Sequence, residues 1–347
     1  MAASAEPIRI AVAGTGFGTR TALPVYQALA EFEPVAIWSR RPERATAAAE
    51  AAGVALGSAS FDELLAVEGL EAVHVATPVA SHHEMALAVL RRGLHLLCEK
   101  PLAMNLAQAR EIARAADEAG VVVSVNFSRR FQETRRRLLE VTAEIVGQPR
   151  LVSISLVHTD HATPESRPFA WVNDAALGGG RLQAYGIHDL DLLLEAFGEV
   201  QSVAAALEVG VPQRPDRSGE QQTVTAEETY ALVFRMRGGG LAVVTLTANA
   251  RHARGDVIEI HGAEGTVRLD ADKRLFHGRA GEQLRVEGPL SADSSDAFTR
   301  VASAFAAAIR DGAAPDPSLD DGLRAQALMD AIARAHAERR WVEVERP

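Results

Sequence analysis

Lysine and cysteine are almost absent from this sequence. Only Lys100 and Lys273 are lysine among the 36 basic residues of the 347-residue chain, and the rest are arginine. The single cysteine, Cys98, excludes an intrachain disulfide, and its place at the end of an expected strand predicts a buried, unreactive thiol. No apolar run approaches the ~18–20 residues of a membrane helix, and no basic segment with an apolar signal core opens the chain. These absences predict a cytoplasmic protein that does not enter a membrane.

Positive charge is also in deficit. The chain has 46 acidic residues against 36 basic ones, a net charge of −10, and its basic residues form no block. This balance argues against nucleic acid or an anionic membrane as the main partner. A hydrophobic share of 47% and a charged share of 24% are typical of a globular protein. A chain of this length exceeds one hydrophobic core, so we expect two domains, residues 1–126 and 127–347.

Short β-branched runs alternate with Ala- and Leu-rich stretches over the first domain. The expected strands are Ile8–Ala13, Pro34–Trp38, Ala72–Ala76, Leu94–Cys98 and Val121–Val125. The expected helices are Pro42–Ala52, His82–Arg92 and Asn105–Ala119, the second of them opened by a capping box at Ser81. Strands and helices that alternate at this spacing predict a parallel sheet wrapped by helices.

The pattern changes after Phe127. Helices are expected over Gln132–Val146, Ile187–Phe197, Ala297–Asp311 and Asp320–Glu338, a polar loop over Thr159–Ala175 and an exposed loop over Pro212–Glu220. The expected strands are Arg150–Val157, Val200–Val209, Glu227–Arg235, Leu241–Thr247, Asp256–His261 and Gly265–Asp270. Most of these strands follow one another without a helix between them, which predicts a largely antiparallel sheet.

A glycine-rich turn follows the first strand. Its residues, Gly14, Thr15, Gly16, Phe17 and Gly18, match the start of a dinucleotide-binding βαβ unit, in which backbone amides and a helix dipole face the pyrophosphate. The third glycine of the usual motif is replaced by Thr19, and Gly18 comes one residue early. We expect this departure to weaken helix–strand packing and to leave the phosphate-facing amides in place.

The second strand ends at Ser39, Arg40 and Arg41. Sites for NAD carry an acidic residue near this point, which binds the ribose 2′-hydroxyl, whereas here no acid precedes Glu43. A hydroxyl and two guanidiniums suit a 2′-phosphate instead. The alternative is that these are solvated charges at a helix start. The sequence predicts a preference for NADP(H), with NAD(H) possible.

Lys100 follows an expected strand directly. The C-terminal ends of parallel strands face the ligand crevice, and a lysine there can bind a substrate hydroxyl and titrate if it is desolvated, which arginine cannot do. The alternative is a salt-bridging loop residue. Lys273 lies between two strands and is expected to be a solvated turn residue.

Several motifs accompany the glycine turn along the chain. They are Ala76-Thr77-Pro78 with His82, Glu99-Lys100-Pro101, Gly178-Gly179-Gly180, Gly186-Ile187-His188-Asp189-Leu190-Asp191, and Ser318-Leu319-Asp320-Asp321-Gly322-Leu323. With the glycine turn, these motifs resemble the glucose–fructose oxidoreductase/inositol dehydrogenase/MocA family over nearly the whole chain. The resemblance implies an α/β protein with an N-terminal Rossmann domain and a C-terminal α/β domain, whose open, mostly antiparallel sheet often forms oligomer contacts. A homodimer or homotetramer is therefore expected.

The resemblance also implies roles for single residues. Lys100 and His188 would be catalytic, the lysine at the reacting hydroxyl and the histidine as acid/base. Further cofactor contacts are expected at Thr77, Pro78, His82, Glu99 and Lys100. The family usually has Asp at the position of Ala184, one helical turn before His188. Without that partner His188 works with Asp191 or Tyr185, or the proton path uses water, or the activity is altered.

Weaker candidates surround these residues. Trp171 and Asp174 are expected either to form a wall of the substrate site or to pack and cap their own turn. Arg130 either reaches the substrate or braces the domain junction. His158, Asp160 and His161 are possible metal-ligand types, but their spacing alone is poor evidence and no metal is expected.

The resulting hypothesis is NADP-dependent hydride transfer to or from a secondary alcohol or ketone of a sugar, sugar derivative or cyclitol. One alternative is a redox-neutral, nicotinamide-dependent glycosidase of the same fold. The other is a non-catalytic NADP-binding regulatory protein, which Ala184 favours and the pair Lys100 and His188 disfavours. The substrate itself cannot be derived from the sequence, since loops form the pocket wall.

Overall fold

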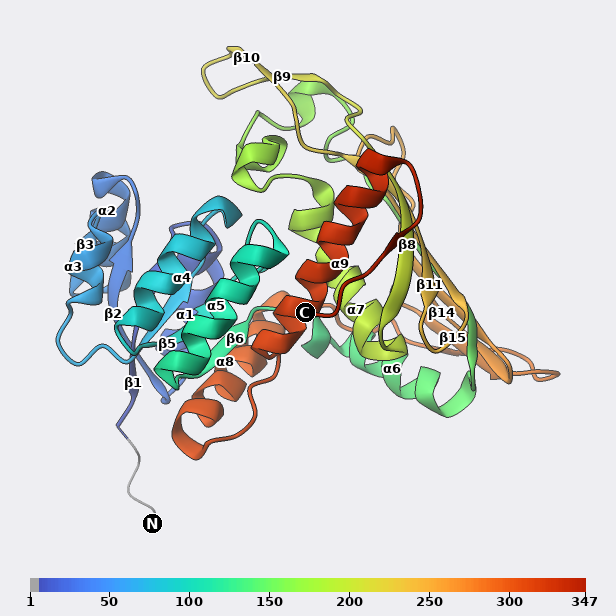
Figure 1. The fold of residues 1–347 in the computed structure, drawn as a ribbon, viewed down its shortest axis with the longest axis horizontal. Helices are drawn as coiled ribbons and strands as arrows, with labels where there is room; N and C mark the ends of the chain where they lie inside the picture. The colour runs from blue at the N-terminus through green and yellow to red at the C-terminus, as the bar shows by residue number, and fades with distance from the viewer. Residues whose placement is uncertain (1–5) are drawn as a thin grey trace. The chain divides into compact units, whose positions relative to one another are not determined.

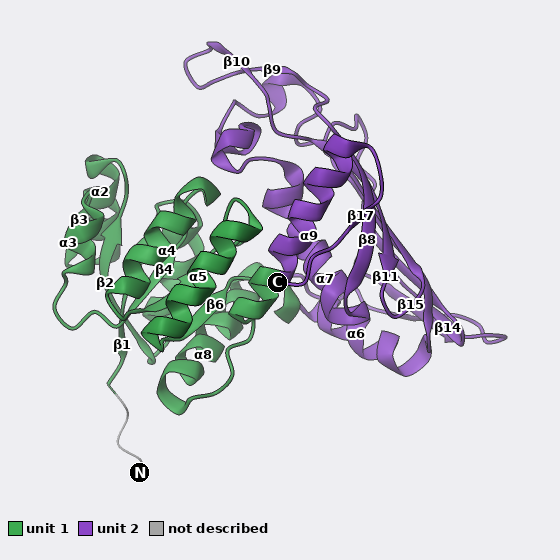
Figure 2. Cartoon of the chain, in the orientation of Figure 1, with its two compact units in different colours: residues 1–131, 294–323 green, residues 132–293, 324–347 purple. Residues whose placement is uncertain are grey.

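The computed structural model describes residues 6–347, which form two compact units (Figure 2). The first segment of unit 1 ends at Phe131, and the chain returns to this unit over Ser294–Leu323; unit 2 comprises Gln132–Asp293 and Arg324–Pro347. The division predicted between residues 126 and 127 does not include this return. It is made by helix α8 (Ser294–Asp311), whose apolar face packs in the core of unit 1.

Unit 1 is built on a six-stranded parallel sheet in the order β3-β2-β1-β4-β5-β6. The strands are β1 (Ile8–Ala13), β2 (Phe32–Trp38), β3 (Leu56–Ser58), β4 (Ala72–Val75), β5 (His95–Cys98) and β6 (Val123–Val125). This order is that of a Rossmann domain and confirms the predicted fold. The direction of strand addition reverses between β1 and β4, where the ends of the two strands leave room for a ligand.

Helices flank this sheet (Figure 1). They are α1 (Leu23–Ala28), α2 (Pro42–Ala52), α3 (Phe61–Leu65), α4 (His82–Arg91) and α5 (Leu106–Ala119), with α8. Helix α4 begins at His82 as expected, but the predicted capping box does not form. The Ser81 hydroxyl donates to Thr77 Oγ1 and to the carbonyl of Pro78, at 2.7 and 2.8 Å, and accepts no helix amide.

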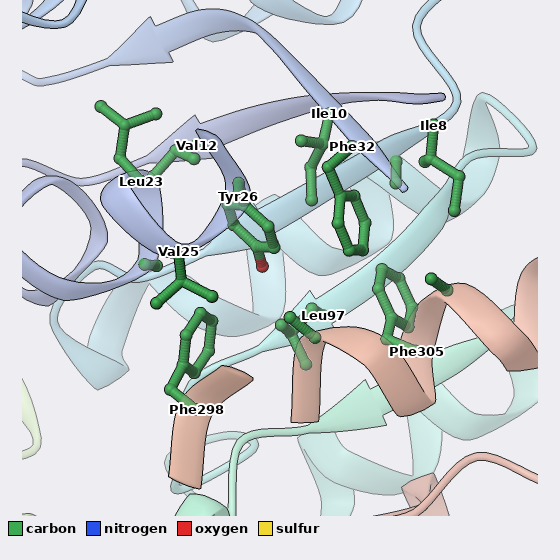
Figure 3. Packing of buried hydrophobic residues seen from close by; sticks show 14 of the residues in the cluster. Ile8, Ile10, Val12, Leu23, Val25, Tyr26, Phe32, Leu97, Phe298 and Phe305 are labelled. Carbon is green, nitrogen blue, oxygen red and sulfur yellow. The ribbon is translucent and has the colours of Figure 1, made fainter. Parts of the chain in front are cut away.

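Aromatic residues of α8 complete the core of unit 1 (Figure 3). Phe298 and Phe305 lie against residues of β1, β2 and α1 and are almost completely buried. The ring of Phe298 meets that of Tyr26 edge-on, with the centroids 5.7 Å apart. Burial of a phenylalanine side chain contributes about 1.5–3 kcal/mol, so α8 is an integral part of this unit.

Unit 2 is built on a nine-stranded sheet in the order β16-β15-β14-β13-β7-β12-β11-β8-β17. The strands are β7 (Pro149–Val157), β8 (Val200–Glu208), β11 (Thr229–Met236), β12 (Leu241–Thr247), β13 (Gly255–Gly262), β14 (Gly265–Leu269), β15 (Leu275–Arg279), β16 (Arg285–Glu287) and β17 (Val342–Glu343). All pairs are antiparallel except β7 with β12. The predicted open, mostly antiparallel sheet is confirmed.

Helices cover one face of this sheet (Figure 1). They are α6 (Glu133–Ile145), α7 (Ile187–Phe197) and the part of α9 (Leu319–Glu338) that belongs to unit 2. Alternate residues of β12 are buried, as expected for a strand covered on one side. On the other face Leu151 and Leu241 are paired in register and exposed. No helix among residues 6–347 has the length and apolarity to span a membrane.

The expected loop Pro212–Glu220 contains structure that the sequence did not predict. It lies in a hairpin of β9 (Gln213–Pro215) and β10 (Gln221–Thr223). Arg214 is fully buried there, 2.7 Å from Glu228 Oε1, and donates to the carbonyls of His161 and Thr163. Burial of arginine is tolerated because a carboxylate and two carbonyls satisfy its guanidinium.

Candidate active site

Three turns follow neighbouring strands of unit 1 at the C-terminal edge of its sheet. They are the glycine turn after β1, Ala76–Pro78 after β4 and Glu99–Pro101 after β5. Because parallel strands all end at the same edge, these turns lie together at the point where strand order reverses. The predicted cofactor residues and Lys100 therefore share one edge of one unit.

Gly14 and Gly18 of the glycine turn are each required for a different steric reason. At Gly14 the φ angle is +122°, and a Cβ would lie 2.2 Å from the carbonyl oxygen of Ala76. At Gly18 a Cβ would lie 2.7 Å from Cγ1 of Val12. Gly18 thus provides the close helix–strand approach that we expected to be weakened. The chain continues in a π-helical turn over Gly18–Ala22, which has a longer repeat than an α-helix and accommodates the early glycine.

The middle of this turn is open. A Cβ at Gly16 would meet no atom within 4 Å, and the residue is exposed with a negative φ. Packing within the described part of the protein therefore does not require glycine at position 16. Backbone without side chains at the edge of a parallel sheet, beside a helix start, fits the approach of a dinucleotide pyrophosphate. Thr15 and Phe17 flank it and are half-buried.

The end of β2 presents the basic pair predicted for the ribose end of the cofactor. Ser39 is buried, and its amide donates to the carbonyl of Ser58 at 3.1 Å. Arg40 and Arg41 are exposed, immediately before Pro42 begins α2. An exposed guanidinium pair beside a buried serine fits a phosphate, which accepts hydrogen bonds from both groups.

Lys100 lies in an environment that favours loss of its proton. Burial is the main cause that lowers the pKa of Lys100, to about 8; Glu99 acts in the opposite direction, and Arg129 adds to the lowering. A lysine of this kind can carry its charge near neutral pH and still titrate in the working range of an enzyme. Lys273, by contrast, lies in a turn with a φ of +61° and is half-buried.

His82 connects two of the three turns. Its ring is fully buried, with Nδ1 2.8 Å from the carbonyl oxygen of Pro101 and Nε2 2.8 Å from that of Thr77. Burial lowers the pKa of His82. His82 thus links the turns that follow β4 and β5, and its contact with a cofactor stays a prediction; Pro78 is the exposed member of this group.

In unit 2, α7 carries His188 and Asp191, both buried. Arg135 of α6 donates to the carbonyl of His188, and its Nη2 lies 2.7 Å from Asp189 Oδ1. This buried pair fixes the first turn of α7 to α6, and the turn bears the predicted acid/base.

The segment directly before α7 is a π-helical turn and not a turn of α-helix. Ala184 and Tyr185 lie in this turn, Leu182–Gly186, where the sequence suggested α-helical spacing between position 184 and His188. The Tyr185 hydroxyl donates to Asp256 Oδ2 at 2.8 Å, and His158 Nε2 lies 2.6 Å from Oδ1. Tyr185 is thus linked to a carboxylate and a second histidine.

Comparison with known proteins decides the family. Residues 8–127 match the model of an oxidoreductase family with an NAD-binding Rossmann fold, and residues 141–344 match the model of its C-terminal α/β domain. This chain belongs to the Gfo/Idh/MocA oxidoreductase family. An uncharacterized oxidoreductase of Synechocystis sp. is 30% identical to this chain, in an alignment that covers 97% of this chain and 96% of the length of the relative.

Two further Gfo/Idh/MocA relatives have named activities. D-apiose dehydrogenase of Paraburkholderia graminis is 27% identical over 96% of this chain and 89% of its own. The structure of a levoglucosan dehydrogenase in complex with NADH and levoglucosan is 25% identical, with a TM-score of 0.87 over 98% of this chain and 100% of its own. The chain is therefore an NAD(P)-dependent oxidoreductase of the dehydrogenase/reductase class.

The weaker candidates of this oxidoreductase have contacts of their own. Arg130 pairs with Asp321 at 2.9 Å and with Asp316 at 3.4 Å, all in unit 1, and so braces the segment that leads into α9. The Asp174 carboxylate accepts from the amide of Ala176 at 3.0 Å and caps its own turn. Trp171 is 37% exposed. The contact of Asp174 matches its capping alternative, the contacts of Arg130 lie within unit 1, and the substrate roles of both residues stay predictions.

The histidines considered as metal ligands have separate partners. His158 contacts Asp256, whereas His161 Nδ1 lies 2.8 Å from Glu228 Oε1 in the buried cluster around Arg214. Within residues 6–347 no three His, Cys, Asp or Glu side chains are grouped to hold a metal ion. Cys98 is buried as predicted, and burial raises the pKa of its thiol.

A polar group in the core of unit 1 was not predicted from the sequence; Tyr26, His74 and Asn126 form it around Glu99. His74 Nε2 lies 3.5 Å from Glu99 Oε1, and Asn126 Nδ2 donates to the same oxygen. The signal was present in the sequence. His74 is the one polar residue of β4, a strand buried on both faces, where apolar residues are the rule.

Proposed function

We propose that this oxidoreductase transfers hydride between NADP(H) and a secondary alcohol or ketone of a sugar, sugar derivative or cyclitol. The observation that carries the proposal is Lys100, a desolvated lysine at the C-terminal edge of a Rossmann sheet, in a chain whose basic residues are arginine except for Lys100 and Lys273. The substrate class is supported by the relatives, two of which are named for D-apiose and levoglucosan.

Each proposed catalytic residue has one task. When bound, the nicotinamide supplies or accepts the hydride. The Lys100 ammonium donates a hydrogen bond to the substrate oxygen and stabilises negative charge on it. His188 accepts or returns the hydroxyl proton, which imidazole does well near neutral pH. Trp171, Tyr185 and Asp191 are proposed substrate contacts of unit 2, as the sequence suggested, and Arg130 and Asp174 are retained with their bracing alternatives.

The cofactor preference is proposed from the pair Arg40 and Arg41 with Ser39. Two exposed guanidiniums beside a 2′-phosphate should favour NADP over NAD in kcat/KM by at least about tenfold. Arg40→Ala with Arg41→Ala should remove that preference and leave kcat/KM for NAD nearly unchanged. Arg92→Ala, which removes an exposed charge at the C-terminal end of α4, is the matched control. Equal use of both cofactors by the unaltered enzyme would refute the preference.

A panel of sugars, polyols and keto-sugars tests the activity. Each compound is incubated with NADP⁺ or NADPH, and in parallel with NAD⁺ or NADH, and the absorbance of reduced nicotinamide is followed. Net oxidation or reduction of at least one member is expected. Cleavage of a glycoside without net cofactor change would identify the redox-neutral glycosidase instead. Tight NADP(H) binding with no conversion of any compound would favour the regulatory protein.

We also propose a homodimer or homotetramer. Its support is the uncovered face of the unit 2 sheet, where Leu151 and Leu241 form an exposed apolar pair. Light scattering on the intact enzyme should give a mass of two or four chains, and Leu241→Glu should shift it toward one. A monomeric mass for the unaltered enzyme would refute this assembly.

A further inference from the structure

A continuous set of polar side chains crosses the core of unit 1 beneath the glycine turn. Tyr26 comes from α1, His74 from β4, Glu99 from the end of β5 and Asn126 from the end of β6. Tyr26 and His74 are fully buried and Asn126 nearly so. The His74 ring stacks on Phe298 at 5.6 Å and meets Phe17 of the glycine turn edge-on at 6.3 Å. These aromatic contacts hold the imidazole plane in one orientation.

The hydrogen-bond pattern assigns the tautomer of His74. The Tyr26 hydroxyl lies 3.1 Å from His74 Nδ1. His74 Nε2 faces Glu99 Oε1 at 3.5 Å, and because an ionised carboxylate can only accept hydrogen bonds, the proton of the neutral ring is assigned to Nε2. Nδ1 is then an acceptor. The Tyr26 phenol, whose pKa is raised by burial and by Glu99, donates to it.

Glu99 is thereby held as an anion in a partly buried place, with its side chain 13% exposed. Burial alone would raise its pKa, but His74, Lys100 and Asn126 together outweigh burial and lower it. The carboxylate in turn acts on the next residue, since it opposes the effect of burial on the ammonium of Lys100. Tyr26 thus orients His74, His74 acts on the charge of Glu99, and Glu99 acts on the protonation of Lys100.

We propose that His74, oriented by Tyr26, is a positioning residue for Lys100: its Nε2–H holds the Glu99 carboxylate charged and in place, and that carboxylate keeps Lys100 protonated. This inference rests on the proposed function only for the task of Lys100. The coupling itself is a property of unit 1 and can be measured without turnover. It also explains why a polar residue occupies β4.

Other titratable groups near Glu99 do not obscure a measurement above neutral pH. They are Cys98 of β5, His82 of α4 and Tyr26 of α1, with Arg129 acting on Lys100. Burial raises the pKa of Cys98 and Tyr26 and lowers that of His82. Each therefore keeps one protonation state while Lys100 titrates.

The scarcity of lysine makes the experiment direct. In the full-length enzyme labelled with ¹³C at lysine Cε, only Lys100 and Lys273 give side-chain signals, and Lys100→Met identifies which is which. The titration midpoint of the Lys100 signal is measured in two matched double variants. Tyr26→Phe with His74→Gln keeps an N–H donor toward Glu99, whereas Tyr26→Phe with His74→Leu has none. Neither variant contains His74, so its own titration contributes to neither curve.

The two variants should differ. With His74→Leu the midpoint falls by at least about half a pH unit, because a weaker or displaced opposite charge supports the ammonium less. With His74→Gln the midpoint stays near that of the unaltered enzyme. Glu99→Gln sets the largest possible fall, and Val73→Ala, in the same strand, is the packing control and should leave the midpoint unchanged. Identical midpoints in the two double variants would overturn the proposal.

Two further measurements distinguish a variant that does not fold, or a wrong proposed function, from a wrong role for His74. Should the leucine variant not fold, Tyr26→Phe alone removes the hydroxyl that donates to Nδ1 and must lower the Lys100 midpoint in the same direction; no change would overturn the proposal. In turnover, the leucine variant should move the alkaline limb of kcat/KM to lower pH, and the glutamine variant should restore it. If Lys100→Met keeps normal turnover, the proposed function fails while the NMR result on His74 still stands or falls separately.

Discussion

Gly16 and Gly18 stand two residues apart in the same turn, and the structure predicts opposite effects of adding one methyl group to each. Gly16→Ala should fold normally and lose affinity for the cofactor. Gly18→Ala should be less stable and keep more of its affinity when folded. The difference follows from what a Cβ would meet at each position, which is nothing within 4 Å at Gly16 and Val12 Cγ1 at 2.7 Å at Gly18.

The magnitudes follow from these distances. Val12 is fully buried in β1 and cannot withdraw, so overpacking at Gly18 costs about 1–3 kcal/mol. Replacing glycine in a helical turn recovers about 1 kcal/mol, which leaves a net loss of about 1 kcal/mol. At exposed Gly16 the stability change is within about 0.5 kcal/mol. A methyl group where the backbone meets pyrophosphate should weaken NADPH binding at least about tenfold, or about 1.4 kcal/mol.

Two measurements check this pair. Denaturant unfolding without cofactor gives the stability of each variant, and fluorescence titration with NADPH gives its affinity. The reasoning is refuted if Gly16→Ala binds NADPH as tightly as the unaltered enzyme. It is also refuted if Gly16→Ala loses more stability than Gly18→Ala, since the open position would then be a packed one.

Two other predictions concern the core and the pH profile. Phe298→Ala should destabilise unit 1 by about 3–5 kcal/mol in urea unfolding, because α8 supplies a fully buried ring; a loss below about 1 kcal/mol would contradict the place of α8 in that core. The pKa of Lys100 is about 8, below the ordinary lysine value, so its ammonium is lost as pH rises through that point, and kcat/KM should fall there. A profile that stays flat up to the ordinary lysine pKa of about 10.4 would contradict this.

Much of the fold could be predicted because periodicity and turn residues report it locally. Helices α2 and α7 and strands β1 and β12 have the predicted bounds. What could not be predicted depends on distant partners. Arg214 looked exposed because nothing near it in sequence indicates that Glu228 and two carbonyls would satisfy it. The return of α8 to unit 1 is likewise a tertiary packing effect.

In the candidate site, too, the features that local sequence signals indicate could be predicted and the others could not. The glycine turn and Lys100 were found from strand ends and motif spacing, which are local. The π-helical turns at Gly18–Ala22 and Leu182–Gly186 were not, because one extra residue in a turn leaves no clear trace in hydrophobic periodicity. The early Gly18 is explained by the first of them. The second includes Ala184 and Tyr185, where the sequence suggested α-helical spacing.

Replacement of Lys100 tests the central claim most directly, with Lys273→Arg as the control for the other lysine. With a substrate from the panel, Lys100→Met should reduce kcat by about 10²–10⁴-fold while NADPH binds as before. Lys100→Arg should also fail although it retains the charge, because a guanidinium differs in shape and does not titrate. Near-normal kcat for Lys100→Met, with NADPH still bound, would contradict the account.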